Sequence, residues 1–138
     1  MPIQELNIRP TNVSPEIHFL PEENIFIIRG NSSPEDVRAL YYPVIDWIKK
    51  FIDSLVLTKS WRNSFTPEAP LRFRVDLLYF NSSSAKFLYD IFMELQRLAP
   101  AGIPFVVEWV YEKEDIDLKE AGSDIASLAG MEFTFVEK

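Results

Sequence analysis

Three consecutive serines follow an asparagine at the point where a strand-like run ends, at Asn81, Ser82, Ser83 and Ser84. An apolar run precedes this block, and a segment with helical periodicity follows it. In open α/β sheets, ligands and modifications gather beyond the carboxyl ends of the strands. The free N–H groups and the dipole at a helix N-terminus also favour a phosphate. The block is therefore the first candidate for a modification site.

The same block has a purely structural interpretation. Serine and asparagine are preferred N-cap residues, so the sequence Asn-Ser-Ser before a helix can serve only to cap it. Three serines exceed what one cap requires. At this level both interpretations stay open.

A catalytic interpretation finds little support. The glycines that flank the serine of a G-x-S-x-G nucleophile elbow are missing. The chain has no cysteine, and its one histidine, His18, falls in an early strand with no evident reason to reach the serines. The acidic run at Glu112, Glu114, Asp115, Asp117, Glu120 and Asp124 fits no EF-hand spacing and is interpreted as a solvated or partner-facing surface. We therefore expect no enzyme, no metal site and no cofactor.

Composition limits the class of protein further. The chain has 138 residues, 47% of them hydrophobic, and 14 basic against 21 acidic residues give a net charge of −7. This length fits one domain over residues 1–138. The negative charge argues against a nucleic-acid partner, and no apolar run is long enough to insert into a membrane. The absence of cysteine and of a visible signal peptide fits a cytoplasmic protein.

Short β-prone runs surround the helical segments. Residues 1–15, with three prolines, are expected to be an irregular lead-in. The expected strands cover residues 17–20 and 24–29, which form a hairpin, then 71–80, 105–111 and 131–136. The strand at 71–80 alternates at its start and is expected to be buried at its apolar end.

Three segments have helical periodicity. The first is expected to begin with Ser33 as N-cap and Pro34 at the first helical position, and its apolar stripe reaches Leu55. The others cover about residues 85–98 and 115–129, with Gly122 as an unfavourable position in the last. Residues 58–70 are expected to form a loop.

The order of these elements predicts the fold class. Strands separated by helices imply right-handed crossovers and parallel pairing. We expect an α/β fold with a single mixed, largely parallel sheet, an N-terminal antiparallel hairpin and about three helices.

Three stretches of the chain resemble the SiaC family of regulatory phosphoproteins. Residues 30–36, with Tyr42-Pro43 and Asp46-Trp47, are similar to the family's G-x-S-Y-P-E-N start and following helix. Residues 79–86 are similar to its Y-F-N-T-S-S-S-K block. The third stretch comprises residues 109–112, 120–122 and 131–135. Together they span nearly the whole chain from Ile17 onward.

The resemblance implies a fold like that of STAS-type anti-sigma-factor antagonists and a function as a signalling switch. Family members are phosphorylated by a Ser/Thr kinase with a histidine-kinase-like fold and dephosphorylated by a PP2C-type phosphatase. In the best-known case, the unphosphorylated form binds and stimulates a diguanylate cyclase, which makes cyclic-di-GMP. A constitutive interaction or scaffold domain, with the serines as helix caps only, is the alternative.

The resemblance also implies the site residues. The accepting hydroxyl falls on Ser82, with Ser83 as the alternative, and Asn81, Ser84 and Lys86 surround it. Two positions depart from the family pattern, because Ser82 replaces the usual threonine and Ser33 stands where a tyrosine is common. A phosphate adds roughly −1.5 to −2 charges, which a docked partner would have to desolvate or repel.

Overall fold

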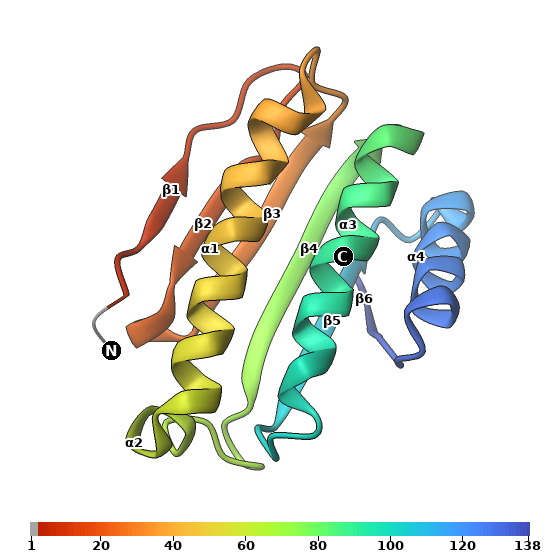
Figure 1. Ribbon diagram of the computed structural model, residues 1–138. Helices are drawn as coiled ribbons and strands as arrows, with labels where there is room; N and C mark the ends of the chain where they lie inside the picture. The colour runs from red at the N-terminus through yellow and green to blue at the C-terminus, as the bar shows by residue number, and fades with distance from the viewer. Residues whose placement is uncertain (1–2) are drawn as a thin grey trace.

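Six strands form one mixed sheet in the order β1-β2-β3-β4-β5-β6 (Figure 1). The computed structural model describes residues 3–138. The strands are β1 (Leu6–Ile8), β2 (Glu16–Leu20), β3 (Ile25–Ser32), β4 (Leu71–Phe80), β5 (Phe105–Tyr111) and β6 (Thr134–Glu137). The helices are α1 (Val37–Leu57), α2 (Lys59–Arg62), α3 (Ser82–Leu95) and α4 (Ile116–Ala129), and 3-10 turns occupy Pro21–Glu23 and Gln96–Leu98.

The predicted fold class is confirmed. β2 pairs antiparallel with β1 and β3, whereas β3, β4, β5 and β6 pair parallel with one another. The three long helices α1, α3 and α4 are the crossovers between the parallel strands, and α2 adds only one turn. Among the described helices, none is both long and apolar enough to cross a bilayer.

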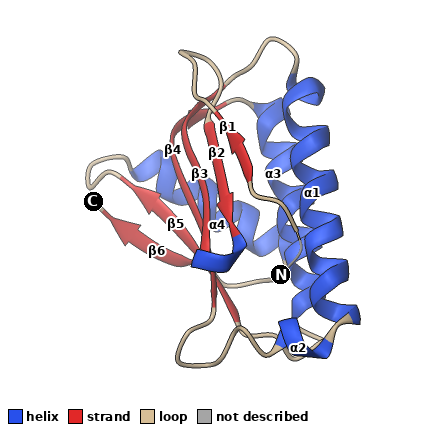
Figure 2. Ribbon diagram, turned by 90° about the vertical axis from the view of Figure 1, so that its left-hand side faces the viewer, coloured by secondary structure: helices blue, strands red, loops and turns tan. Residues whose placement is uncertain are grey.

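Helices cover one face of the sheet and leave the other open. In Figure 2, α1 and α3 stand on the right of the sheet, and β5 and β6 curve away to the left. Successive right-handed crossovers that advance in one direction place their helices on the same face. We call the opposite side, formed by strand side chains that point away from α1 and α3, the rear face.

The core lies between the sheet and the helices. Alternate strand residues point into it, such as Ile17 and Phe19 on β2 and Phe73 and Val75 on β4, and they are almost fully buried. The apolar stripe of α1 covers them and includes Val44, Ile48, Phe51, Ile52 and Leu55. The two-residue repeat of the strands and the 3.6-residue repeat of the helices both place apolar residues where sheet and helices meet. The sheet and the helices therefore bury one continuous core.

Two segments that were expected to be irregular contain short elements. The lead-in holds β1, which pairs with β2, and the Trp47 Nε1 atom donates to the Gln4 carbonyl at 2.7 Å. The expected loop at 58–70 begins with the four residues of α2. Both elements are too short to leave a periodic pattern, and β1 depends on its pairing with β2.

The start of α1 differs from the prediction. The helix begins at Val37, and its N-cap is Asp36, which accepts a hydrogen bond from the Ala39 N–H at 3.1 Å. Ser33 therefore is not the cap, because β3 extends to Ser32 and the chain needs the following residues to turn. Beyond this start α1 is continuous to Leu57, although Pro43 lies inside it.

The end of β4 is exposed rather than buried. Opposite Gly30 and Asn31 of β3 stand Leu77 and Tyr79, so Leu78 is an extra residue in a β-bulge. Leu78 and Tyr79 are 50% and 55% exposed. The apolar run therefore presents side chains to solvent just before the serine block. The last strand also differs, since β6 begins at Thr134 rather than at residue 131.

Gly122 has a packing role in α4. A Cβ atom at this position would lie 2.5 Å from the Cε2 and Nε1 atoms of Trp109. The Trp109 indole is buried against α4, and its Nε1 donates to the Leu118 carbonyl at 3.0 Å. The glycine that weakens the helix in isolation therefore lets α4 approach β5 closely.

Replacing Gly122 with alanine should therefore destabilise the protein, despite alanine's higher helix propensity. We expect a loss of about 1–3 kcal/mol in the free energy of unfolding, because the indole must move and loses its hydrogen bond. Urea unfolding measures this change. Ser123→Ala, at an exposed position of the same helix, is the control and should change stability by less than about 0.5 kcal/mol. A Gly122→Ala variant as stable as wild type would contradict this packing role.

Candidate functional site

The serine block forms the first turn of α3. The helix begins at Ser82, three residues before the predicted start, and Asn81 is its N-cap. The Asn81 side-chain oxygen accepts a hydrogen bond from the Ser84 N–H at 2.8 Å, and its carbonyl accepts one from the Ala85 N–H at 3.0 Å. Because Asn81 has extended backbone angles, the chain passes directly from β4 into the helix.

A buried cluster of hydroxyl groups fixes this turn to the sheet. The Ser84 Oγ atom donates to the Ser32 carbonyl at 2.9 Å, and the Ser32 Oγ atom donates to Ser84 Oγ at 2.8 Å. The Tyr41 hydroxyl lies 2.6 Å from Ser32 Oγ. Since the Ser32 proton is directed to Ser84, Tyr41 is the donor to Ser32. We call these three residues the hydroxyl cluster.

The hydroxyl cluster joins three elements at one point. Ser32 ends β3, Tyr41 lies on α1, and Ser84 is the third residue of α3. The Ser32 carbonyl also accepts from the Asn81 N–H at 3.0 Å. All three cluster side chains are fully buried, and the Tyr41 ring stacks on Phe87 with centroids 5.6 Å apart. These contacts leave little freedom at the start of α3.

The orientation of the other two serines follows from this anchoring. Because Ser84 points inward, Ser82 and Ser83 occupy the outer part of the turn, and both are exposed. Neither of their hydroxyl groups has a hydrogen-bond partner within residues 3–138. The block thus divides into one structural serine and two that an external protein can reach.

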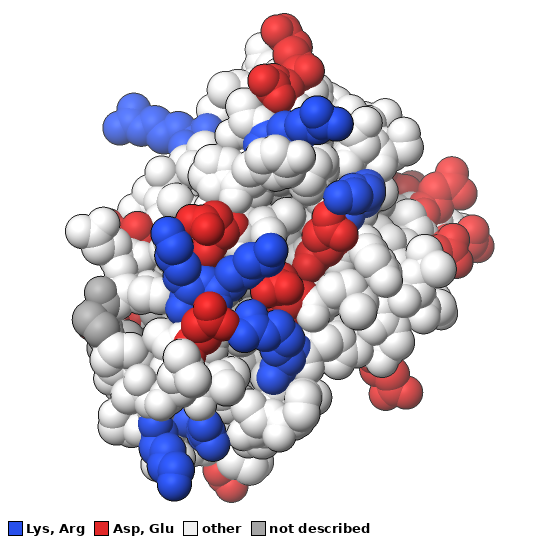
Figure 3. Space-filling model, in the orientation of Figure 1, with Lys and Arg blue, Asp and Glu red and all other residues white. Residues whose placement is uncertain are grey.

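The electrostatic surroundings are compatible with an added anion. No acidic residue lies in the first turn of α3, so nothing there offsets the positive end of the helix dipole. Lys86 follows on the next turn, where its Nζ atom pairs with Asp90 at 2.7 Å and its side chain remains 67% exposed. Figure 3 shows charged groups of both signs along the middle of this face, whereas acidic groups gather at the right-hand edge over α4.

A groove between α1 and α3 leads away from the serines. Ser83 lines its upper part with Arg38 and Phe87, and a second hollow of about 400 Å³ continues it along Ile45 and Asp90. Tyr42 borders both parts and is 57% exposed, with its ring edge against Phe87. An exposed aromatic residue that borders a groove is typical of a protein-contact surface.

The structure brings most of the predicted site residues together. Asn81, Ser82, Ser83 and Lys86 lie on one outward surface of α3. Ser84 lies beside them but is buried, so it belongs to the framework and cannot face a partner.

Residue types alone did not single out three further residues at this site, Ser32, Tyr41 and Tyr42. A buried tyrosine usually needs a partner for its hydroxyl, and that signal could have indicated a polar residue near Tyr41. His18, by contrast, lies on the rear-face side of β2 and contacts Asn7. It is thus on the opposite side of the sheet from α3.

Comparison with known proteins agrees with this description. The family model for SiaC family regulatory phosphoproteins matches residues 8–138. An uncharacterized protein of Pseudomonas aeruginosa strain UCBPP-PA14 is 26% identical over 122 residues, which are 88% of this chain and 87% of that protein.

Solved structures show the same relationship. The crystal structure of apo-SiaC from Pseudomonas aeruginosa has a TM-score of 0.74 at 25% identity, covering 98% of each chain. A chain in the crystal structure of the diguanylate cyclase SiaD in complex with its activator SiaC, from the same organism, has a TM-score of 0.76 at 26% identity. That match covers 96% of this chain and 97% of the other.

The hydroxyl cluster predicts different effects for adjacent serines. Ser84→Ala should lower the free energy of unfolding by about 1–3 kcal/mol, because it leaves the buried Ser32 hydroxyl without its acceptor. Ser83→Ala is the matched control and should stay within about 0.5 kcal/mol of wild type. Urea unfolding followed by tryptophan fluorescence measures both. Equal effects of the two substitutions would show that the cluster is not the anchor of α3.

Tyr41 should make stability depend on pH under alkaline conditions. Burial raises the pKa of its hydroxyl above the ordinary value of 10.0, while hydrogen bonds with Ser32 and Ser84 lower it to a smaller extent. The unfolded chain therefore releases this proton at a lower pH than the folded chain. The stabilisation is complete below about pH 10 and decreases as the pH rises toward the folded pKa.

Urea unfolding of wild type and Tyr41→Phe at a series of pH values tests this dependence. The wild-type free energy of unfolding minus that of the variant should fall as the pH rises above about 10. Tyr42→Phe, which removes an exposed hydroxyl, is the control for general alkaline effects. A difference that stays constant or grows would contradict the assigned direction.

Proposed function

The chain belongs to the SiaC family of regulatory phosphoproteins, and we propose that it is a non-enzymatic signalling switch of the bacterial cytoplasm. In this proposal, reversible phosphorylation of Ser82 controls the binding of a partner protein. The single observation that carries it is the exposed serine pair on a turn that Asn81 and the hydroxyl cluster hold in place.

The local structure supports Ser82 as the acceptor. It is exposed at the first position of α3 and immediately follows the capping asparagine, as the accepting hydroxyl does in the family block. Ser83 is also exposed and is the alternative acceptor. Ser84 is fully buried, so a kinase could not reach it without opening the start of α3.

A phosphate at this position should leave the fold intact. It would carry roughly −1.5 to −2 charges at the positive end of the α3 dipole, where an exposed anion gains about 0.3–1 kcal/mol. Lys86, one turn further along the helix, offers a flexible ammonium group. The core contacts of Ser84 and Tyr41 point the other way and need not change.

The phosphate would affect a bound partner differently from the fold, because it would lower the partner's affinity. The groove between α1 and α3 starts at Ser83, and its exposed Tyr42 offers apolar contact area. A partner seated there would have to desolvate or repel the phosphate. A loss of about 1.4 kcal/mol lowers affinity tenfold, and a buried unpaired charge exceeds that. Phosphorylation would therefore release the partner.

Relatives indicate which partner to test first. SiaC of Pseudomonas aeruginosa forms a complex with the diguanylate cyclase SiaD as its activator. We extend this to the present chain and propose a diguanylate cyclase as its target, which places the switch in cyclic-di-GMP regulation. A Ser/Thr kinase with a histidine-kinase-like fold and a PP2C-type phosphatase would add and remove the phosphate.

The capping residue weighs against the scaffold alternative, in which the serines act only as caps. The cap of α3 is Asn81, and of the three serines only Ser84 makes side-chain contacts with the framework. Capping therefore gives no reason for Ser82 and Ser83 to be serines. The position of His18 on the other side of the sheet from α3 similarly favours a non-enzymatic role.

Phosphopeptide mapping tests the site assignment. The chain is incubated with the kinase of its host and ATP, and Ser82→Ala and Ser83→Ala variants are treated identically. We expect one phosphate on wild type and on Ser83→Ala, and none on Ser82→Ala, because only Ser82 is the acceptor. The two variants differ by one position on the same exposed turn, so each is the control for the other.

The mapping also separates the alternatives. Phosphate that persists on Ser82→Ala but is lost from Ser83→Ala would move the acceptor to Ser83. Absence of phosphate from the wild-type protein, both after this treatment and when purified from its host, would reject the switch in favour of the scaffold.

A further inference from the structure

The rear face carries a second candidate surface, on the side of the sheet opposite to Ser82. Strands β3, β4 and β5 pair parallel, and parallel strands are normally covered on both faces. No helix of the described chain runs over the rear face (Figure 2). Its side chains include Ile25, Ile27 and Val106 next to charged residues, so the surface is only partly polar.

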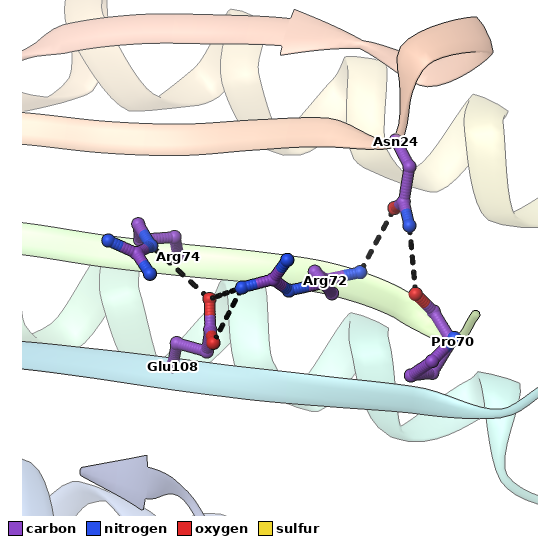
Figure 4. Close-up of polar contacts among 5 residues, drawn as sticks. All are labelled: Asn24, Pro70, Arg72, Arg74 and Glu108. Atoms are coloured by element: carbon purple, nitrogen blue, oxygen red, sulfur yellow. Dashed lines mark hydrogen bonds and ion pairs between the residues drawn. The ribbon is translucent and has the colours of Figure 1, made fainter. Parts of the chain in front are cut away.

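Two arginines and one glutamate form the centre of this face. Arg72 Nη2 contacts both carboxylate oxygens of Glu108 at 3.0 and 3.1 Å, and Arg74 Nε contacts one of them at 3.2 Å (Figure 4). Two positive charges thus share one negative charge. The Glu108 side chain is 12% exposed, against 53% for Arg72 and 34% for Arg74. A molecule that approaches this cluster therefore meets the two guanidinium groups before the Glu108 carboxylate.

The guanidinium groups keep unused donors. Arg74 uses only Nε in its contact with Glu108, and its two Nη atoms have no acceptor within residues 3–138. A guanidinium has five N–H donors and suits bidentate binding of a carboxylate. The pair therefore has both surplus charge and free hydrogen-bonding capacity.

The framework holds this pair before any partner binds. Asn24 adopts a left-handed conformation at the end of the β2–β3 turn, with φ 54°. Its side chain accepts from the Arg72 N–H at 3.1 Å and donates to the Pro70 carbonyl at 2.9 Å, which ties the start of β4 to the hairpin (Figure 4). Such preorganisation lowers the entropic cost of binding.

A third arginine continues the pattern along the sheet. Ile27 stands beside Arg74, and Arg29 stands beside Asp76, so Arg72, Arg74 and Arg29 occupy three successive rows of the same face. Along a parallel strand, successive side chains on the same face are about 6.6 Å apart. In an extended peptide, side chains on one side repeat at the same distance. Arg72 and Arg74 therefore match carboxylates at alternate positions of an extended segment, whereas Arg29 already pairs with Glu16, from Nε and Nη2 to Oε1 at 2.9 and 2.7 Å.

We propose that the rear face binds an acidic, extended segment of a partner protein. Carboxylates at alternate positions of the segment would bind Arg72 and Arg74, beside Ile25 and Ile27. These residues line one shallow hollow of about 310 Å³. The chain as a whole carries a charge of −7, whereas the lining of this hollow, with three arginines against Asp76 and Glu108, has a surplus positive charge that favours acidic partners. This surface does not depend on Ser82.

Fluorescence anisotropy with a labelled hexapeptide tests the proposal. The probe alternates glutamate and valine, and the control peptide has glutamine in place of glutamate. We expect the full chain to bind the probe and not the control. Arg72→Gln/Arg74→Gln should weaken probe binding by at least about tenfold, because it removes two charge-assisted contacts. Lys49→Gln/Lys50→Gln removes the same charge from α1 and should change binding by less than about twofold.

A further variant distinguishes loss of binding from loss of the native structure. Removing both arginines leaves the Glu108 carboxylate unpaired. The triple variant Arg72→Gln/Arg74→Gln/Glu108→Gln removes this unpaired charge as well. It should also fail to bind the probe, and it should retain the native circular dichroism spectrum. Ser82→Ala should bind the probe like wild type, which separates this surface from the phosphorylation site. Backbone amide shifts in NMR spectra should centre on Arg72, Arg74 and Glu108.

Three outcomes would overturn the proposal. The first is equal binding by wild type and both arginine variants. The second is no binding of the probe to wild type up to about 1 mM, the weak limit of specific recognition. The third is displacement of the probe by inorganic phosphate at the same concentration as by unlabelled peptide, which would identify a small-anion site instead.

Discussion

A single carbonyl group with three hydroxyls around it holds the start of α3. The Ser32 carbonyl accepts hydrogen bonds from the Asn81 N–H and from Ser84 Oγ, and the Tyr41 hydroxyl completes the cluster through the Ser32 side chain. Buried polar groups are costly unless they are paired, so these hydrogen bonds offset the cost of burying the three hydroxyls and favour this arrangement. The arrangement joins β3, α1 and α3, and it determines which serines face outward.

This anchoring explains how one short sequence could serve both folding and the proposed phosphorylation switch. Asn81 caps the helix, Ser84 binds the sheet, and Ser82 and Ser83 remain outside these contacts. A modification of the outer serines therefore changes the surface charge without acting on the core. The favourable dipole term of about 0.3–1 kcal/mol is small, but a partner that buries the same phosphate faces a larger cost. The proposed switch would alter association and leave the fold unchanged.

The sequence predicted the long elements well and the local connections less well. β4 and β5 have the predicted bounds and α4 differs by one residue, because their apolar patterns extend over seven or more positions. The placement of Ser82 at a strand-to-helix junction followed from the same patterns. The separate role of Ser84 could not be predicted, since its partner Ser32 lies 52 residues away and leaves no local signal.

Competition between local signals accounts for the remaining differences. Ser33 and Pro34 form a good helix start, yet Asp36 caps α1 because pairing in β3 continues to Ser32. β1 has three residues and exists through its pairing with β2, which no pattern within the lead-in encodes. The bulge at Leu78 likewise depends on the register between two strands that are far apart in sequence, and it exposes an end of β4 that appeared fit for burial.

The most direct test of the central claim compares the chain with and without phosphate on Ser82. Its affinity for the diguanylate cyclase of its host and its thermal unfolding midpoint are measured on the same two samples. We predict that the phosphorylated form binds at least about tenfold more weakly, a change of about 1.4 kcal/mol, while the unfolding midpoint does not fall. Equal affinity of the two forms, or weaker binding together with a marked loss of thermal stability, would contradict a switch that acts through the surface of an intact fold.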